Sequence, residues 1–398
     1  MTGITVPGGG LEQLKQAVLG REACSACGAC VGLCPYIQCV EDRVAAVADC
    51  RKTDGRCFLF CPRAHAPEDP PAGHVPQAFE EQLGPFRRIL QGRALGGALH
   101  RGAQHGGVVT ALLLQALRSG LIEAAILTRY TGGHPETFVA RTEEEVQSAG
   151  GSKFAVAPTV AEVNRAVAHE GLEGVPLGVV ALPCQAAALA RVRKVTALRD
   201  TLRNEVANEG AEQASGGDHP DWVERPFPSI TLVVGLFCTW ALSRDGWLQI
   251  ARSVGGDSDE PSAVVRAEIP PPPANVLELD LADGRSAQVS LDEVRGHIRE
   301  GCRLCADMTS EWADVSVGLV EGKEGWNTVI TRTEVGDALV EEAARAALIQ
   351  AEPLGTERTA HLAGASSGKK TRARETAKER GLSLPYLPAQ TEEGREDD

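Results

Sequence analysis

Apolar residues along this chain follow two patterns in turn, which predict helices and buried strands. Residues 106–128, GGVVTALLLQALRSGLIEAAILT, are apolar nearly all round a helix and then turn at a glycine into a short apolar run. Residues 178–192, GVVALPCQAAALARV, show the reverse order: an apolar strand, a proline at a helix start, and an alanine-rich helix. Further strands are predicted at 229–237, 313–320 and 327–333. Strands that alternate with helices indicate α/β architecture.

Breaks in this pattern suggest where the main domain begins and ends. Residues 1–66 hold a dense group of cysteines and little hydrophobic sequence, which is typical of a small metal-stabilised module. Residues 67–100 contain PEDPPAGHVP and are predicted to be a linker. The main domain is expected over 101–350, and the charged tail, 351–398, has room for one helix and is expected to be partly disordered. Two surface loops are predicted within the main domain: 204–226 and the proline run 270–273.

The composition argues against several classes of protein. With 398 residues the chain can bury more than one core. Its formal net charge of -14 argues against a nucleic-acid surface, which needs Lys and Arg to neutralise phosphates. No apolar run reaches the roughly eighteen residues that a membrane helix needs. The N-terminus, MTGITVPGGG, has neither the basic nor the apolar region of a secretory signal, so we expect a cytoplasmic protein without a membrane span.

Twelve cysteines in such a chain indicate metal ligation, because a reducing cytoplasm opens most disulfides. Only two Met and nine His accompany them, so thiolate is the main soft ligand, and iron–sulfur clusters are favoured over zinc. Cys24, Cys27, Cys30 and Cys34 form the run CxxCxxCxxxCP. In such a run three thiolates bind one [4Fe-4S] cube and the fourth serves a neighbouring cluster. By this logic Cys24, Cys27 and Cys30 bind the first cluster, and Cys61 is its fourth ligand.

The second N-terminal set is incomplete. Cys34 would join Cys50 and Cys57, but six residues separate the latter two where a two-cluster ferredoxin has a middle cysteine. Cys39 is the candidate for the missing ligand. If Cys39 does not reach the others, the site is a three-iron cluster, a cluster with a non-thiolate ligand, or empty.

Four further cysteines are scattered through the main domain. Cys184 lies at a predicted strand-to-helix turn, Cys238 ends a predicted strand, and Cys302 and Cys305 form a CxxC pair. Such positions can meet at one edge of a sheet and hold a third cluster, with zinc as the main alternative. A lone cysteine between apolar residues is also commonly a buried small side chain, so spacing leaves the choice open.

Five stretches in order resemble the FrhB/FdhB family, the beta subunits of coenzyme F420-reducing hydrogenase and of related dehydrogenases and reductases. They are QHGGVVTALLLQAL, GSKFAVAPT, ALPCQAAALARVRK, VGLFC and GCRLCADMTSEWADVSVGLVEGKEGWNTVITRT. The late segment KKTRARETAKERGLSLP is also similar, and the cysteine-rich start resembles the ferredoxin-like extension of longer members. The resemblance implies an α+β or α/β protein: a ferredoxin-like iron–sulfur module followed by a mixed α/β, flavin-binding FrhB-like domain.

The resemblance also implies cofactors and site residues. Family members hold FAD beside a [4Fe-4S] cluster, which gives two or three clusters in this chain, and by motif the ligands beside the flavin would be Cys184, Cys238, Cys302 and Cys305. Glycine amides at a helix start suit a pyrophosphate, although without the resemblance they indicate only a tight turn. His105 departs from the family pattern and is given no role. The residues expected at the flavin are Gly106, Gly107, Val108, Thr110, Gly151, Ser152, Lys153 and Gln185.

The activity implied by the resemblance is hydride exchange between a deazaflavin, coenzyme F420, and FAD, with single electrons passing through the clusters to a partner. We expect the protein to position and tune these cofactors, so no acid–base residue is named. One alternative is a ferredoxin-linked reductase of another substrate, similar to 7-hydroxymethyl chlorophyll a reductase. Another is a non-catalytic subunit that transfers electrons within a hydrogenase, formate dehydrogenase or heterodisulfide reductase complex, or to a ferredoxin.

Overall fold

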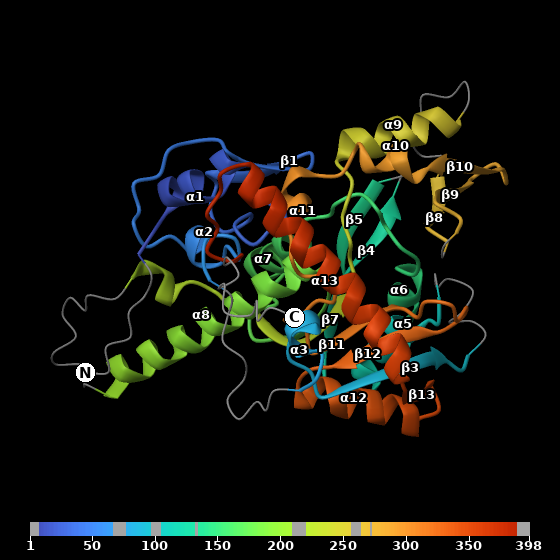
Figure 1. Ribbon diagram of the computed structural model, residues 1–398. Helices are drawn as coiled ribbons and strands as arrows, with labels where there is room; N and C mark the ends of the chain where they lie inside the picture. The colour runs from blue at the N-terminus through green and yellow to red at the C-terminus, as the bar shows by residue number, and fades with distance from the viewer. Residues whose placement is uncertain are drawn as a thin grey trace, which may run out of the picture.

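The computed structural model describes residues 8–66, 77–96, 105–131, 134–208, 220–255, 264–270 and 273–387. Its main feature is an eight-stranded mixed sheet (Figure 1). Four neighbouring strands in the middle are parallel, and the strands outside them are antiparallel. The prediction of a mixed α/β fold is confirmed. In sheet order the strands are β13 (Ile349–Pro353), β3 (Arg88–Ala94), β12 (Asn327–Thr331), β11 (Val315–Leu319), β7 (Ser229–Leu236), β6 (Pro176–Ala181), β4 (Ala124–Thr131) and β5 (His134–Ala140).

Helices cover both faces of this sheet. Along β7, Val233 belongs to one core, and its neighbours Leu232 and Val234 belong to the other, because successive side chains of a strand point to opposite faces. The Val233 face packs against α7 (Thr159–His169) and α8 (Pro183–Asn208). The opposite face packs against three helices: α5 (Val108–Arg118), α6 (Glu143–Ser148) and α12 (Glu334–Arg345).

The N-terminal module packs directly on the main domain. Its elements are α1 (Leu11–Ala17), η1 (Leu19–Arg21), the antiparallel pair β1 (Ile37–Val40) and β2 (Arg43–Ala46), and α2 (Arg56–Leu59). Asn164 of α7 donates from Nδ2 to the backbone oxygens of Ala29, at 3.1 Å, and of Val31, at 2.7 Å. Leu59 and Phe60 are buried in the same core as α7 and α8. The module and the sheet therefore share one hydrophobic core.

The segment expected to be a linker, 67–100, contributes to the main sheet. Residues 67–76 and 97–100 lie outside the described ranges, but α3 (Glu80–Leu83) and β3 lie between them. β3 pairs with β12 on one side and with β13 on the other. Its sequence, RILQGRA, carries two arginines and gives a weak strand signal. Its place in the sheet is decided by backbone pairing with strands more than 230 residues later in the chain.

A smaller antiparallel sheet lies beside the main one. It is formed by β8 (Val264–Glu268), β9 (Val276–Leu281) and β10 (Ser286–Ser290), and it packs with α9 (Arg244–Gly255) and α10 (Leu291–Arg295) around the buried Trp247. A short helix, α11 (Glu300–Arg303), follows. Pro270 and Pro273 lie in the β8–β9 connection, as expected of a surface excursion, and residues 271–272 lie outside the described ranges.

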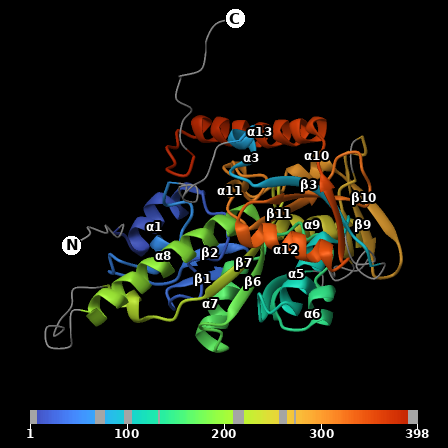
Figure 2. The ribbon, with the colours of Figure 1, turned by 90° about the horizontal axis from the view of Figure 1, so that it is seen from below.

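One further expectation needs correction, and another is made specific. The loop predicted at 204–226 begins later, because α8 continues to Asn208, and η2 (Asp221–Glu224) buries Trp222; residues 209–219 lie outside the described ranges. In the tail, α13 (Thr356–Glu379) is a 24-residue helix that runs along one side of the molecule, from the main sheet to the N-terminal module (Figures 1 and 2). Its buried stripe consists of small and polar residues, which hydrophobic periodicity does not detect: Thr359, Ala363, Ser366, Lys369, Ala373 and Ala377.

Candidate functional site

Two cysteines lie where neighbouring parallel strands end. Ala181 of β6 pairs with Gly235 of β7, so the carboxyl ends of these strands meet at one edge of the sheet. Cys184 follows β6 at the start of α8, and Cys238 follows β7, where its backbone N–H donates to Met308 O at 2.9 Å. Crevices at the carboxyl ends of parallel strands commonly bind ligands.

The CxxC pair lies at the same edge. Cys302 is in α11, and Cys305 N donates to Cys302 O at 3.1 Å, which closes a tight turn. Burial raises the pKa of Cys238, and the nearby Cys302, Cys184 and Cys305 raise it further. Burial and the charge of Cys305 likewise raise the pKa of Cys184. The four residues therefore lie together, and we call them the sheet-edge cysteine group (Cys184, Cys238, Cys302 and Cys305).

The first N-terminal cysteine group (Cys24, Cys27, Cys30 and Cys61) lines a small cavity. Burial, followed by the charge of Cys61, raises the pKa of Cys27 to about 12. Burial also raises the pKa of Cys30, with further contributions from Cys61, Cys27 and Cys24. Fully buried thiols with elevated pKa values are poor nucleophiles on their own, but their clustering is what a metal cluster requires.

The second N-terminal cysteine group consists of Cys34, Cys50 and Cys57. Burial raises the pKa of Cys57 to about 11, and the nearby Cys34 and Cys50 add to this effect. Cys39, the candidate fourth ligand, is in β1, where it pairs with Val44 of β2. Burial raises the pKa of Cys39, and the charged groups that act on it are Arg299, Asp42 and Cys24. Among the cysteines, the one whose charge acts on Cys39 is thus Cys24 of the first N-terminal group.

The three cysteine groups form a series. Cys27 of the first N-terminal group raises the pKa of Cys184 in the sheet-edge group, after burial and Cys305. The charge of Cys57 in the second N-terminal group also raises the pKa of Cys30 in the first group, although it is the smallest of the contributions. Within the described ranges, no group of three or more His, Cys, Asp or Glu side chains is placed to hold a single metal ion.

Basic side chains are buried next to the sheet-edge cysteine group. Lys369 of α13 donates from Nζ to Cys238 O at 2.6 Å and to Asp307 O at 2.7 Å. Arg63 donates to Leu304 O at 2.8 Å. Although burial raises the pKa of Cys305, the Lys369 and Arg63 cations outweigh it and lower the pKa below its usual value. The surroundings of Cys305 therefore favour its thiolate form.

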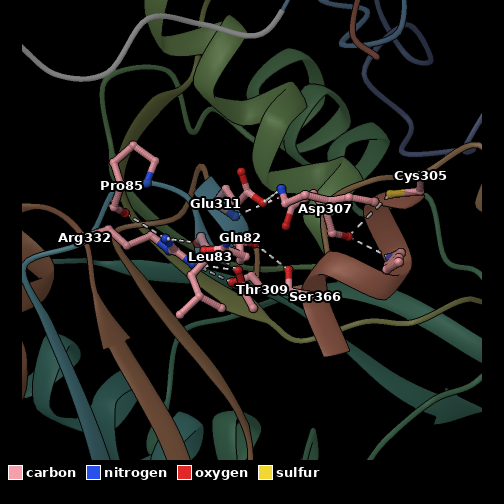
Figure 3. Close-up of polar contacts among 11 residues, drawn as sticks. Gln82, Leu83, Pro85, Cys305, Asp307, Thr309, Glu311, Arg332 and Ser366 are labelled. Atoms are coloured by element: carbon pink, nitrogen blue, oxygen red, sulfur yellow. Dashed lines mark hydrogen bonds and ion pairs between the residues drawn. The ribbon is translucent and has the colours of Figure 1, made fainter. Parts of the chain in front are cut away.

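A buried arginine fixes the segment after the CxxC pair (Figure 3). The Arg332 guanidinium donates to the backbone oxygens of Leu83 at 3.0 Å, Pro85 at 2.8 Å and Thr309 at 3.0 Å, and to Ser316 Oγ at 2.7 Å. Arg332 is only 7% exposed. Because buried carbonyl groups need partners, this arginine ties the cysteine-bearing loop to β11 and to the segment before β3.

A cavity of about 660 Å³ opens beside the sheet-edge cysteine group. This volume is typical of small-molecule and cofactor sites. Cys238 is part of its wall, together with residues that follow β6, β7 and β11. All but one of the residues expected at a flavin also line it: Gly107, Val108, Thr110, Gly151, Ser152, Lys153 and Gln185.

The glycine pair at the start of α5 meets two different requirements. Gly107 is the N-cap residue and has φ 70°, a left-handed conformation that favours glycine. Gly106 is not among the lining residues, and a Cβ atom there would lie 2.7 Å from Asn327 Oδ1, so it is needed for close packing. Asn327 Oδ1 also accepts from Val108 N at 3.3 Å. The pair therefore shapes the helix start that faces the cavity.

Lys153 and Gln185 already have partners in the protein. Lys153 Nζ donates to the backbone oxygens of Ala149 at 2.6 Å and Gly151 at 2.8 Å, and burial lowers its pKa to about 8. Gln185 Nε2 donates to Ala157 O at 2.7 Å, and its Oε1 accepts from Leu182 N at 2.8 Å. Gln185 thus caps the turn before α8, while Lys153 brings a cation to the cavity wall.

Sequence reasoning missed three basic residues of the cavity wall: Arg295, Arg358 and His361. Arg358 and His361 lie one turn apart on α13, and Leu362 and Ala365 continue the same wall. The spacing of positions 358, 361, 362 and 365 is a helical face, so recognition of a packed tail helix would have found it. His105 also lines the cavity, and burial lowers its pKa.

The fold and these features define the class: a cysteine-rich α/β protein with a cofactor-sized cavity against a cysteine group. Residues 89–163 match the family model "Coenzyme F420 hydrogenase/dehydrogenase, beta subunit N-term", and residues 176–357 match the corresponding C-terminal model. The chain belongs to this family of F420-linked oxidoreductase subunits. The expectation from its motifs is confirmed.

Relatives with assigned names support the same family. The beta subunit of coenzyme F420 hydrogenase from Methanothermobacter thermautotrophicus is 29% identical over 76% of this chain and 99% of the relative. One of the subunits of the F(420)H(2) dehydrogenase of Methanosarcina mazei is 25% identical over 80% of this chain and 82% of the relative. The coenzyme F420-dependent sulfite reductase from Methanocaldococcus jannaschii is 28% identical over 81% of this chain and 46% of that longer protein.

A solved structure shows the same fold. A chain of the F420-reducing [NiFe] hydrogenase complex from Methanosarcina barkeri superimposes with a TM-score of 0.61 at 24% identity, over 77% of this chain and 94% of the other. In the part of the chain that the structure describes, no helix combines the length and apolar character needed to span a membrane.

Proposed function

We propose that this chain binds FAD in the 660 Å³ cavity and exchanges a hydride between that flavin and coenzyme F420. Single electrons then pass through iron–sulfur clusters to a partner protein. The names of three relatives refer to coenzyme F420, and one of these proteins is a hydrogenase subunit, which supports the substrate and the kind of partner.

One observation carries the proposal: Cys238 belongs both to the cavity wall and to the sheet-edge cysteine group. A cofactor in the cavity and a cluster on these thiolates would share a residue. Such closeness favours electron transfer between them. When bound, FAD would supply two-electron hydride chemistry and the clusters would supply one-electron steps.

The chain's own residues suit the flavin's anionic groups. The start of α5 carries the positive end of the helix dipole, and its first backbone N–H groups have no intrahelical partners. Val108 N donates to Asn327 Oδ1, so the groups that would face an anion are those of Val109 and Thr110, which line the cavity. Lys153 supplies an ammonium group at the same cavity, and α13 closes another side with Arg358 and His361. The apolar wall formed by Val108, Leu113 and other side chains would exclude water from the reacting ring.

The cysteine groups differ in the number of thiolates that they offer to a cluster. The sheet-edge and first N-terminal groups each offer four thiolates, the number that a [4Fe-4S] cube needs. A cube holds its thiolates at separate corners, farther apart than the ligands of one zinc ion, which all lie about 2.3 Å from the metal. Without Cys39, the second N-terminal group offers three thiolates. We propose a three-iron cluster, or a cube with a non-thiolate ligand, at this last group.

The order of the groups indicates the route. Electrons would enter at the cavity, pass the sheet-edge group and the first N-terminal group, and leave at the second, whose Cys34 and Cys50 are partly exposed. A partner such as a component of a hydrogenase or dehydrogenase complex would dock near that end.

The test uses protein that is reconstituted anaerobically with iron, sulfide and FAD. We expect about one FAD per chain, oxidation of reduced F420, and bleaching of the flavin followed by the clusters. In Cys184→Ser the flavin should still be reduced, while the N-terminal clusters stay oxidised on the same timescale. An iron-loaded protein that binds no FAD would refute the proposal. Bound FAD that never accepts a hydride would favour a non-catalytic electron-transfer subunit.

A further inference from the structure

Lys369 is a buried cation without a carboxylate partner. It is 4% exposed, and its Nζ donates to two backbone oxygens, those of Cys238 and Asp307. Among the described residues it forms no ion pair with Asp or Glu. The next residue, Lys370, shows the ordinary arrangement, because it forms an ion pair with the Glu311 carboxylate.

A buried ammonium group needs a compensating charge. Removing such an ion from water is costly unless an opposite charge replaces its hydration. The two backbone oxygens are dipoles without net charge, and Asp307 uses its Oδ2 to accept from Glu311 N at 3.0 Å. The negative charges that act on Lys369 are those of Cys305 and Cys238, followed by the Asp307 carboxylate and Cys302, so three of the four come from the sheet-edge cysteine group.

We infer that Lys369 is a counter-charge of the sheet-edge cluster and holds the reduction potential of that cluster above the value that the cluster would have without this cation. The inference rests on the proposed function, because it needs a cluster on the sheet-edge cysteine group. It assigns a role to a lysine that no sequence motif identified as part of the site.

The direction of the effect follows from electrostatics. Each electron that the cluster accepts from the reduced flavin adds one negative charge to the cluster and its thiolates. A cation fixed nearby in a medium of low dielectric constant stabilises this reduced form more than the oxidised form. The hydrogen bond from Lys369 to the carbonyl of Cys238 also fixes the position of the charge. Lys369 therefore makes the cluster a better electron acceptor.

The same helix connects this lysine to the flavin cavity. Arg358, His361 and Ala365 line the cavity, and Lys369 follows Ala365 by four residues, on the same face of α13. A single helix thus covers the proposed flavin site and supplies the charge beside the first electron acceptor.

The test is a redox titration of the holoprotein, followed by electron paramagnetic resonance. The signal that disappears in Cys184→Ser identifies the sheet-edge cluster. In Lys369→Met, at a fixed potential, the ratio of reduced to oxidised cluster should fall at least tenfold, which is about 59 mV for a one-electron couple. Lys369→Arg, which keeps the charge, should titrate close to the wild type.

A matched control lies on the same helix. Lys378 is exposed and stands nine residues later, about 14 Å along the helix axis at 1.5 Å per residue. Lys378→Met removes the same charge from a site that water screens. The redox titration of this variant should match that of the wild type.

The outcomes separate the two proposals. A wild-type protein without the signal that depends on Cys184 would overturn the proposed function. A wild-type signal whose midpoint does not move in Lys369→Met would overturn this inference alone. If folded Lys369→Met loses the cluster while Lys369→Arg keeps it, the counter-charge role is supported; loss in both variants would show a packing role and overturn it. If Lys369→Met does not fold, Lys369→Gln, which retains a donor, takes its place in the same comparison.

Discussion

A buried ion pair ties the N-terminal module to the main domain, and its removal should destabilise the protein strongly. The side chains of Arg299 and Asp42 are each 9% exposed and form an ion pair. Arg299 also donates to Asp42 O at 2.8 Å, and Arg244 N donates to Asp42 Oδ2 at 3.0 Å. Arg299 Nε has no hydrogen-bond partner among the described residues. Asp42 is thus the main compensation for a buried guanidinium group.

The expected magnitude follows from this burial. Asp42→Asn keeps an oxygen that can accept from Arg244 N but leaves the Arg299 charge unpaired, which should cost about 3–5 kcal/mol of unfolding free energy. Arg299→Met should cost a similar amount, because it leaves a buried carboxylate. The double variant, Asp42→Asn with Arg299→Met, should lose much less unfolding free energy than the two single variants lose together. Replacing both partners of a buried ion pair is often nearly neutral.

The assay is urea unfolding of anaerobic protein, followed by tryptophan fluorescence. Asp49→Asn is the control, because the Lys15–Asp49 pair lies in the same module, but its carboxylate is 96% exposed. Its urea midpoint should match that of the wild type within error, since exposed ion pairs contribute little. Additive losses in the double variant, or equal effects of Asp42→Asn and Asp49→Asn, would refute the reasoning.

Three further results are expected. Burial lowers the pKa of Lys153 to about 8, so FAD affinity measured by calorimetry should fall as the pH rises through 8, and Lys153→Met should bind FAD more weakly without this dependence. Cys39→Ser should keep the iron content of the wild type, whereas Cys57→Ser should lose iron; equal loss in both would place Cys39 among the ligands. In Gly301→Ala the new Cβ would lie 2.2 Å from Cys24 O, so unfolding free energy should fall by about 1–3 kcal/mol or more, and an unchanged urea midpoint would contradict this close approach.

The core elements of the main domain were predictable from the sequence. The apolar run at 106–128 became α5 and β4, and the run at 178–192 became β6 and the first part of α8. These segments are buried on most sides, so their own composition carries the signal. α13 was harder to predict, because it packs through Ala363, Ser366 and other small or polar residues that leave no apolar stripe. β3 was missed since its burial depends on partners far away in the sequence.

The candidate site shows the same division. The run CxxCxxCxxxCP predicts a cluster site locally, because its ligands are close along the chain. Cys39 shows the limit of such reasoning, since spacing offers it to Cys50 and Cys57, whereas in its two-stranded hairpin the cysteine whose charge acts on it is Cys24. The basic residues Arg358 and Lys369 reach the site only through the docking of α13.

The sequence by itself determined the kinds of ligand that this protein offers, the family to which it belongs and the elements whose apolar pattern is local. Only the tertiary structure decided that Cys27 and Cys184 are neighbours, that Cys238 is part of the cavity wall and that a lysine from the tail lies beside it. The physical reason is that distances between remote segments depend on strand pairing and helix docking. Neither is written in the spacing of residues along the chain.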